Sequence, residues 1–372
     1  IIVGSRVDEG PGAAPGHIRA FNVRTGKQEW IFHTIPQPGE EGYDTWDDPN
    51  AYKHIGGANC WSGFTLDEKK GIVFVPTGSA SYDFYGLMRK GDNLFADCLI
   101  ALDAATGKKI WHFQQIHHDV WDRDLPTPPA LVTVKREGKD IEAVAQPTKS
   151  GYVYVFERTT GKPLFPITEE PLPQQTDLPG EKLSPTQPKP SLPAPFVRQV
   201  FNAGEVNNLI SEEEQIAIKK KLDSLNNGFF MPPSQKGTVI FPGYDGGAEW
   251  GGPAFDEETG LLYINANEMP WILQLRKSEN KSMDESWLQA GQRIYTNTCM
   301  ACHGTNRQGT GNYPSILNVH TKYTAAQFDE LLQTGRRMMP AFKQLSAEER
   351  SAVASFILED KKGQQKKFMQ VA

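Results

Sequence analysis

The chain has 372 residues and a net charge of −6, from 39 basic and 45 acidic side chains. This length is enough for two or more domains with buried cores, and the acidic excess argues against a nucleic acid partner. No apolar run is long enough to cross a bilayer, so the sequence predicts no transmembrane segment.

The chain begins Ile1-Ile2-Val3-Gly4, which has the pattern of the middle of a strand and lacks an initiator methionine. We therefore expect a fragment edge at this end, beyond which a leader peptide could have been lost.

A short unit recurs through residues 1 to about 283. Each copy places an acidic or amide residue and a glycine turn between two β-rich stretches, and a large aromatic or aliphatic residue follows. The copies are Ala20–Trp30 and Ala101–Trp111, with weaker ones at Val155–Lys162, Phe255–Tyr263 and Leu66–Phe74. Repeats of this kind indicate blades arranged radially, with the two tryptophans docked between neighbouring blades.

The repeat unit resembles the tryptophan-docking blades of pyrroloquinoline quinone (PQQ) dehydrogenases, an eight-bladed quinoprotein family that oxidises alcohols and sugars. The resemblance covers most of residues 1–275 and implies an all-β propeller. A propeller closes by pairing its last blade with its first, and this chain has too few blades to do so. We therefore expect an incomplete propeller over residues 1–283 and a second domain over residues 284–372.

Segments near the start of the chain resemble parts of the family's cofactor site. The segment ending at Trp61 resembles the one whose tryptophan stacks beneath the PQQ ring, which implies that role for Trp61. The family holds Ca²⁺ through a glutamate, an asparagine and the catalytic aspartate, which are hard oxygen ligands. By resemblance Glu9 is the glutamate ligand, and a solvated loop carboxylate is the equal alternative. Ser79 stands where the alcohol dehydrogenases of the family carry the asparagine, so the second side-chain ligand stays open.

The loop around Asp122 carries three aspartates, two histidines and a tryptophan just after an expected strand, which is more charge than a turn requires. By resemblance, Asp122 is the family's catalytic aspartate and a Ca²⁺ ligand. Lys149 then matches the cation that contacts the quinone carbonyls. The alternative for a carboxylate in this loop is turn capping, which suits Asp119 or Asp124.

The rest of the first domain is less informative. Residues 163–196 are dense in proline, which predicts an extended excursion over the surface. A capping box predicts a short helix over residues 212–222. Cys60 and Cys98 are expected to be buried free thiols, and a disulfide between them is the alternative in an oxidising compartment.

Cys299-Met-Ala-Cys302-His303 is the attachment signal for a c-type haem, in which the two thiols add to the haem vinyl groups and the histidine binds the iron. A zinc site would need a second ligand pair at matched spacing, and the sequence has none. Met339, which precedes a proline, can supply the sixth iron ligand. Met338 is the fallback ligand, and ordinary core packing is the alternative for Met339.

Helical patterns surround the haem motif. Apolar residues recur at helical spacing over residues 287–295, before the cysteines. Capping boxes at Thr324 and Ser346 open two later helices, and Gly335 stands where a C-terminal cap belongs. Three short helices around a loop resemble a class I cytochrome c, so we expect a small all-α domain with covalent haem c.

Together the two domains resemble a quinohaemoprotein, nearest to the branch that is similar to membrane glucose dehydrogenases. The resemblance implies an oxidoreductase that uses PQQ and Ca²⁺ to oxidise a CH–OH group of a sugar or alcohol. Electrons would pass singly to the haem and then to an external cytochrome or oxidase. Because bacteria assemble covalent haem outside the cytoplasm, a periplasmic or exported protein is implied. The alternative function is an electron-transfer cytochrome c fused to a PQQ-free propeller that serves as a binding scaffold.

Overall fold

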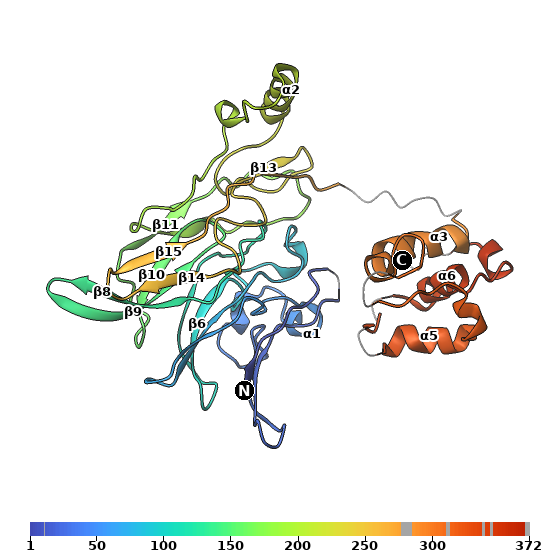
Figure 1. The fold of residues 1–372 in the computed structure, drawn as a ribbon, viewed down its shortest axis with the longest axis horizontal. Coiled ribbons are helices and arrows are strands. Elements are labelled where there is room, and N and C mark those ends of the chain that lie inside the picture. Colours follow the sequence, from blue (N-terminus) through green and yellow to red (C-terminus); the bar gives the residue numbers. More distant parts are fainter. Residues whose placement is uncertain (11, 277–284, 310–312, 337–338, 343–344, 369–372) are drawn as a thin grey trace. The chain divides into compact units, whose positions relative to one another are not determined.

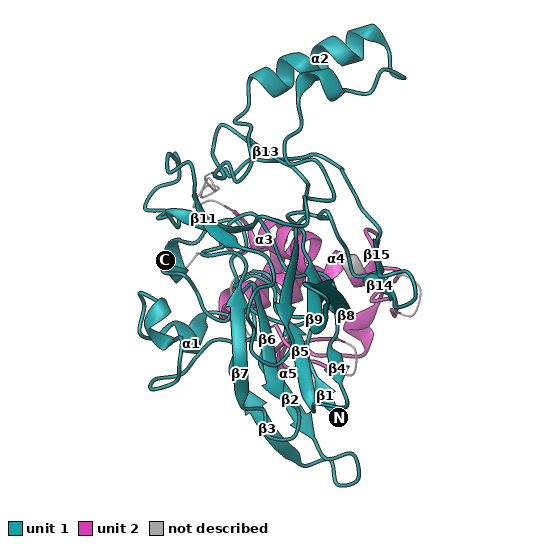
Figure 2. Cartoon of the chain, turned by 90° about the vertical axis from the view of Figure 1, so that its left-hand side faces the viewer, with its two compact units in different colours: residues 1–276 teal, residues 277–372 magenta. Residues whose placement is uncertain are grey.

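The computed structural model describes residues 1–10, 12–276, 285–309, 313–336, 339–342 and 345–368. The chain divides into two compact units, unit 1 with residues 1–276 and unit 2 with residues 277–372 (Figure 2). The boundary that the sequence predicts, between residues 283 and 284, lies outside the described residues. Within the described ranges, no helix combines the length and apolar character that a membrane span requires.

Unit 1 consists of small antiparallel sheets joined by long loops (Figure 1). The four-stranded sheet contains β4 (Thr65–Asp67), β5 (Ile72–Pro76), β6 (Cys98–Asp103) and β7 (Lys109–Gln114). The three-stranded sheets are β1 (Ile2–Val3), β2 (Ile18–Phe21) and β3 (Gln28–Phe32), and β8 (Ala130–Arg136), β9 (Lys139–Pro147) and β10 (Val153–Glu157). The two-stranded sheets pair β11 (Ile167–Pro171) with β12 (Thr186–Pro190), β13 (Thr238–Ile240) with β16 (Trp271–Leu273), and β14 (Pro253–Asp256) with β15 (Leu261–Ile264).

The hairpins of the two tryptophan-bearing repeats, Ala20–Trp30 and Ala101–Trp111, close with the same kind of turn. Asp103 accepts hydrogen bonds through Oδ1 from the backbone N–H of Ala105 and Thr106, and Gly107 then adopts a left-handed φ of +70°. Asn22 and Gly26 repeat this arrangement between β2 and β3. The side chain replaces backbone partners in the turn, and glycine takes the left-handed position without steric cost. The predicted strand–turn–strand units are therefore confirmed for these two copies.

Tryptophan docking between neighbouring repeats is also confirmed. The indole of Trp30 lies against Gly107 of the next copy, where an added Cβ would come within 2.5 Å of the ring. Its Nε1 donates to the carbonyl oxygen of Ala104, 3.2 Å away. Trp111 packs in the same way on Gly161, which belongs to the copy at Val155–Lys162. An added Cβ at Gly161 would lie 2.6 Å from the ring. The glycine of each of these turns is therefore also the surface on which the indole of a neighbouring repeat packs.

Gly107→Ala is expected to destabilise unit 1 more than Gly26→Ala. Both glycines have nearly the same left-handed φ, +70° and +69°, so both variants carry backbone strain of about 1–2 kcal/mol. Gly26 has open space around its Cβ position, whereas Gly107 faces Trp30, which adds about 1–3 kcal/mol of overpacking. Thermal unfolding of the three proteins measures the difference. Equal losses in both variants would show that indole docking contributes little.

Both faces of strand β6 are buried, so this strand holds neighbouring sheets together face to face. Cys98 and Ile100 pack in one apolar cluster with residues of β2 and β5, and Leu99 and Ala101 pack in another with residues of β7 and β10. A strand that is buried on both faces reads as a continuous apolar run, as this one does. Cys60 and Cys98 are both buried free thiols, as predicted.

The described residues of unit 1 form two α-helices, α1 (Ala51–His54) and α2 (Glu212–Asp223). The predicted capping box opens α2, where Ser211 Oγ accepts from the backbone N–H of Glu214. The proline-dense segment contains the β11–β12 hairpin, which its sequence did not reveal.

The described part of unit 2 is helical. Its elements are α3 (Trp287–Ile294), a π-helical turn (Tyr295–Cys299), α4 (Met300–His303), α5 (Ala325–Thr334) and α6 (Ala347–Ile357). Thr324 and Ser346 cap α5 and α6 through the predicted capping boxes, and Gly335 ends α5 with a φ of +69°. The apolar faces of α3, α5 and α6 share one core. The three predicted helices are therefore present at the predicted places.

Candidate active site

A cavity of about 440 Å³ opens where the loops of unit 1 converge. Seven acidic and two basic side chains line it, together with an indole and small polar residues. The lining residues are Arg6, Val7, Asp8, Glu9, Gly57, Asn59, Trp61, Ser79, Asp83, Asp122, Asp124, Lys149, Asp245 and Glu249. All four residues that the sequence assigned to the quinone and its metal, Glu9, Trp61, Asp122 and Lys149, line this one cavity.

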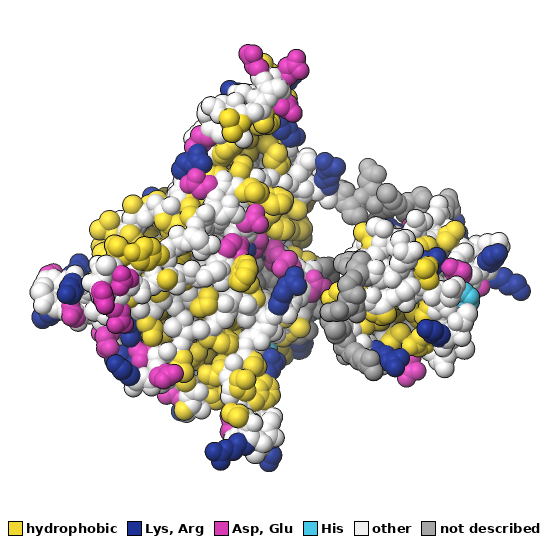
Figure 3. All heavy atoms as spheres, in the orientation of Figure 1, with side chains coloured by type: hydrophobic (Ala, Val, Ile, Leu, Met, Phe, Trp, Pro, Cys, Tyr) yellow, Lys and Arg dark blue, Asp and Glu magenta, His cyan; other side chains and the backbone are white. Residues whose placement is uncertain are grey.

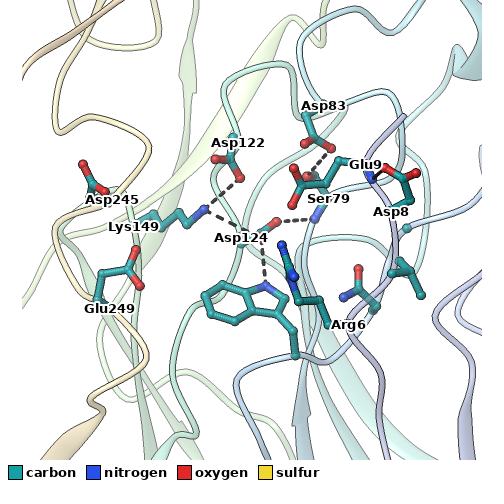
Figure 4. A pocket seen from close by; sticks show the side chains of 14 residues that line it. Arg6, Asp8, Glu9, Ser79, Asp83, Asp122, Asp124, Lys149, Asp245 and Glu249 are labelled. Carbon is teal, nitrogen blue, oxygen red and sulfur yellow. Dashed lines mark hydrogen bonds and ion pairs between the residues drawn. The ribbon is translucent and has the colours of Figure 1, made fainter. Parts of the chain in front are cut away.

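The pair formed by Asp122 and Lys149 occupies the middle of the cavity (Figure 4). Asp122 lies in the loop after β7 with a left-handed φ of +57°, and Lys149 follows β9. Lys149 Nζ lies 2.8 Å from Asp122 Oδ1 and 3.7 Å from Asp124 Oδ2. The lysine side chain is only 6 % exposed, so this cation is directed at the carboxylates rather than at solvent.

Asp124 connects three segments that are distant in the sequence. Its Oδ2 accepts a hydrogen bond from Trp61 Nε1 at 2.8 Å, and its Oδ1 accepts one from the backbone N–H of Ser79 at 2.6 Å. Lys149 Nζ lies 5.8 Å from the centre of the Trp61 ring. Asp124 therefore fixes the plane of the indole relative to the Asp122–Lys149 pair.

Further carboxylates approach from two sides of this centre. In Figure 4, Asp8, Glu9 and Asp83 lie on one side, and Asp245 and Glu249 lie on the other. Ser79 Oγ lies 3.4 Å from Asp83 Oδ1 and can donate to it. Burial raises the pKa of Asp83 to about 8, and repulsion from Asp124 and Glu9 adds to the shift. The side chains near Ser79 are therefore carboxylates that repel one another.

The pKa values of the central pair reflect the same crowding. Burial raises the pKa of Asp122 well above its ordinary value; Lys149 opposes this shift and Asp124 adds to it. Burial acts to lower the pKa of Lys149, but Asp124 and Asp122 outweigh it and the pKa is raised. Lys149 is therefore a stable cation, and Asp122 is a carboxylate that is more basic than one in water.

The acidic excess of the cavity is the feature that fits a divalent cation. Figure 3 shows acidic side chains gathered near the middle of the visible face of unit 1. An anionic quinone would add to this charge, and only Arg6 and Lys149 offset it among the lining residues. Carboxylate oxygens are the ligands that Ca²⁺ prefers, and Glu9, Asp83 and Asp122 supply them. The indole of Trp61 offers a flat apolar surface for a planar ring.

Buried polar contacts hold the Asp122 loop in place. Asp119 caps it, as predicted for a carboxylate of this loop, by accepting hydrogen bonds from the backbone N–H of Trp121 and Arg123. Arg123 donates through Nη1 to the carbonyl oxygen of Pro242, which leads into the opposite wall of the cavity. The loop is therefore tied to its own turn and to the wall that carries Asp245 and Glu249.

Several lining residues were not found from the sequence. Asp124 was one of two candidates for turn capping, and its two oxygens instead accept hydrogen bonds from Trp61 and from the backbone of Ser79. Asp83 and Asp245 had no motif to mark them. The alternation Asp-Arg-Asp at 122–124 was the one available signal, because residues two apart in an extended loop can point to the same side.

The haem motif has two buried residues in unit 2, Cys299 and His303. Cys299 is buried, and Met339 packs against the same apolar cluster. His303 Nδ1 donates to the carbonyl oxygen of Pro314 at 2.9 Å, which leaves Nε2 as the atom with a free lone pair. A histidine held in this way through its other nitrogen is the usual arrangement of a metal ligand. The residues present therefore fit a haem iron, and Met338 lies outside the described residues.

Two family models match the chain. The model described as glucose/ethanol/alcohol dehydrogenase, beta-propeller domain, matches residues 1–321. The model described as cytochrome C oxidase, cbb3-type, subunit III, matches residues 287–357, which include the haem motif.

Individual curated proteins that are similar to this chain are also dehydrogenases. The glycerol dehydrogenase large subunit of Gluconobacter oxydans is 34 % identical over 271 residues, which are 71 % of this chain and 35 % of that protein. A quinoprotein glucose dehydrogenase of the same organism is 36 % identical over 266 residues, 70 % of this chain and 32 % of that protein. The chain thus spans about a third of the length of these curated relatives.

Among solved structures, the quinohemoprotein alcohol dehydrogenase of Comamonas testosteroni shares the fold with a TM-score of 0.51. It is 24 % identical and covers 73 % of this chain and 36 % of its own. Stacked antiparallel blades, docked tryptophans and the family match over residues 1–321 agree. The chain therefore belongs to the glucose/ethanol/alcohol dehydrogenase β-propeller family of quinoproteins.

Proposed function

We propose that this chain is the site-bearing part of a quinohaemoprotein dehydrogenase that oxidises a CH–OH group of a sugar or alcohol. The observation that carries the proposal is the single cavity in which Trp61, Asp122 and Lys149 meet. Bound PQQ would accept hydride from the carbinol carbon, and bound haem c would take up the electrons one at a time.

Asp122 acts as the general base. Its Oδ1 contacts Lys149, whereas no hydrogen bond from the described residues reaches Oδ2. Oδ2 is therefore the atom that can accept the proton of a substrate hydroxyl. Lys149 holds its charge in the centre of the cavity, where it can stabilise negative charge on a carbonyl oxygen of the quinone.

Trp61 supports the planar cofactor, and Asp124 holds the indole in position through Nε1. Glu9 and Asp122 are the proposed Ca²⁺ ligands, and Asp83 is a further carboxylate on the side of the cavity that carries Ser79. Ca²⁺ at these residues would offset the acidic excess and leave Lys149 free to face the quinone.

Cys299 and Cys302 would hold the haem covalently, and His303 and Met339 would supply the protein ligands of its iron. The Pro314 carbonyl fixes the imidazole so that Nε2 is available to the iron. The partner that takes electrons from the haem would be a soluble cytochrome or an oxidase. A periplasmic or exported location follows from covalent haem attachment.

The test is substrate-dependent haem reduction by the full chain, produced in a host that matures c-type cytochromes. PQQ and Ca²⁺ are added, and the ferrous α-band is recorded with a panel of aldoses and alcohols. Reduction that requires PQQ, Ca²⁺ and a substrate supports the proposal. A haem that is reducible by dithionite but by no substrate would instead favour the PQQ-free scaffold.

The pH profile of the reaction should respond to Lys149. Only ionised Asp122 can accept a proton, so kcat/KM should rise with pH through the pKa of that group. Lys149 lowers this pKa, so Lys149→Gln should move the ascending limb to higher pH as well as lower the rate. Steady-state kinetics across the pH range measure both effects. A limb that stays in place would show that Asp122 is not the titrating base.

Met339→Ala should lower the midpoint potential of the haem. A thioether ligand stabilises ferrous iron, and its loss removes that stabilisation. Met300→Ala is the matched control, because Met300 packs against the same core without being a proposed ligand. Spectroelectrochemical titration gives both potentials. An unchanged potential in Met339→Ala would contradict the ligand assignment.

A further inference from the structure

Asp97 is a buried carboxylate behind the cavity wall. It precedes β6, is 1 % exposed, and does not line the cavity itself. Its Oδ1 is fully buried and receives no hydrogen bond from the residues that the structure describes. A buried anion without a partner is costly, so an oxygen in this position calls for a positive group that faces it.

Two other carboxylates face the same point. Asp97, Asp119 and Asp124 each offer an oxygen that lies within 4.8 Å of the oxygens of the other two. Asp119 is as buried as Asp97, and Asp124 forms part of the cavity wall. The three side chains come from the start of β6 and from the loop after β7, so tertiary structure alone assembles them.

The nearby cations are directed elsewhere. The Arg89 guanidinium is buried and donates to the carbonyl oxygens of Tyr82 and Asp119 and to the side chain of Asn93. Arg123 Nη1 donates to the carbonyl oxygen of Pro242. Lys149 pairs with Asp122 and approaches only Asp124 of the three. Within the described part of the chain, no side-chain cation therefore contacts Asp97.

We propose that Asp97, Asp119 and Asp124 bind a divalent cation, such as Ca²⁺, behind the cavity wall and apart from the Ca²⁺ proposed at Glu9 and Asp122. Ca²⁺ binds oxygens at about 2.3–2.6 Å, so oxygens within 4.8 Å of one another can share one ion. The oxygens of Asp119 and Asp124 already accept one hydrogen bond each, which leaves a second lone pair on each.

The ion would have a structural effect on the active site. It would fix Asp124, which in turn orients Trp61 and the backbone at Ser79. The site does not depend on the proposed dehydrogenase activity, because its three carboxylates are present whether or not PQQ binds.

Calcium binding to the full chain tests the proposal. Wild type and Asp97→Asn are stripped with chelator and dialysed against Ca²⁺, and bound calcium is counted by mass spectrometry of the metal. Asp97→Asn should hold one equivalent fewer than wild type. Asp140→Asn, at an exposed position on β9, is the matched control and should hold the wild-type number. Equal binding by wild type and Asp97→Asn overturns the proposal.

Thermal unfolding provides an independent readout. In chelator at neutral pH, Asp97→Asn should unfold at a higher temperature than wild type, because buried Asp97 must either remain an unpaired charge or take up a proton, and the amide avoids both costs. In Ca²⁺ the order should reverse, because only wild type gains the ion at Asp97, Asp119 and Asp124, whereas both proteins bind the one proposed at Glu9 and Asp122. If the amide variant does not fold, Asp97→Ser gives the same comparison with a smaller side chain. A wild-type unfolding temperature that is identical in chelator and Ca²⁺ also overturns the proposal.

Glu9→Gln separates this site from the cofactor site. It should remove the equivalent proposed at Glu9 and Asp122 and retain the one that depends on Asp97. A normal calcium count in Glu9→Gln would count against Glu9 as a ligand in the proposed function. The result for Asp97→Asn would stand in either case.

Discussion

Asp122→Asn should lower kcat for substrate oxidation by about 10²–10⁴-fold, which is the usual contribution of a positioned general base. The amide keeps the shape of the carboxylate and can still contact Lys149, but it cannot accept the proton of a substrate hydroxyl. Because the change is isosteric, the fold and the haem spectrum should persist. Stopped-flow recording of haem reduction after mixing with substrate, in the presence of PQQ and Ca²⁺, measures the loss.

Asp124→Asn is the variant to compare with Asp122→Asn, because Asp124 is the other carboxylate that forms an ion pair with Lys149. Both oxygens of Asp124 already accept hydrogen bonds, from Trp61 and from the backbone of Ser79. Its variant should weaken cofactor binding through the indole more than it slows proton transfer. If Asp124→Asn stopped turnover at saturating PQQ while Asp122→Asn stayed active, the two roles would have to be exchanged.

Replacement of both Cys299 and Cys302 by alanine should abolish covalent haem and, with it, the substrate-dependent change at the ferrous haem α-band. Each thiol forms one thioether bond to the porphyrin, so the double variant has no covalent attachment left. Intact mass and the pyridine haemochrome spectrum of the purified chain report the loss directly. The PQQ-dependent step can still be followed with an artificial electron acceptor.

Cys98→Ala is the matched control, because Cys98 is also a buried thiol but lies on β6 in unit 1. It should keep the full haem content. Covalent haem in the double variant, or its absence from wild type made in a maturation-competent host, would contradict the haem assignment.

The sequence by itself determined those features that depend on residues close together in the chain. The haem motif occupies five consecutive residues, and a capping box spans four, so local spacing reveals both. The repeat unit likewise fits one hairpin, which is why the turns at Gly26 and Gly107 could be located in advance. Asp122 and Lys149 were found by resemblance to a family pattern, and the structure places them 2.8 Å apart.

Only the tertiary structure decided how distant segments meet. Asp124 accepts hydrogen bonds from residues 63 and 45 positions away, and nothing in the local pattern around Trp61 or Ser79 indicates this partner. Asp83 and Asp97 likewise look like ordinary loop acids in the sequence. Their raised pKa values arise from burial and from carboxylates contributed by other loops. The physical reason is that desolvation and charge repulsion depend on distances in space, and the order of blades sets those distances.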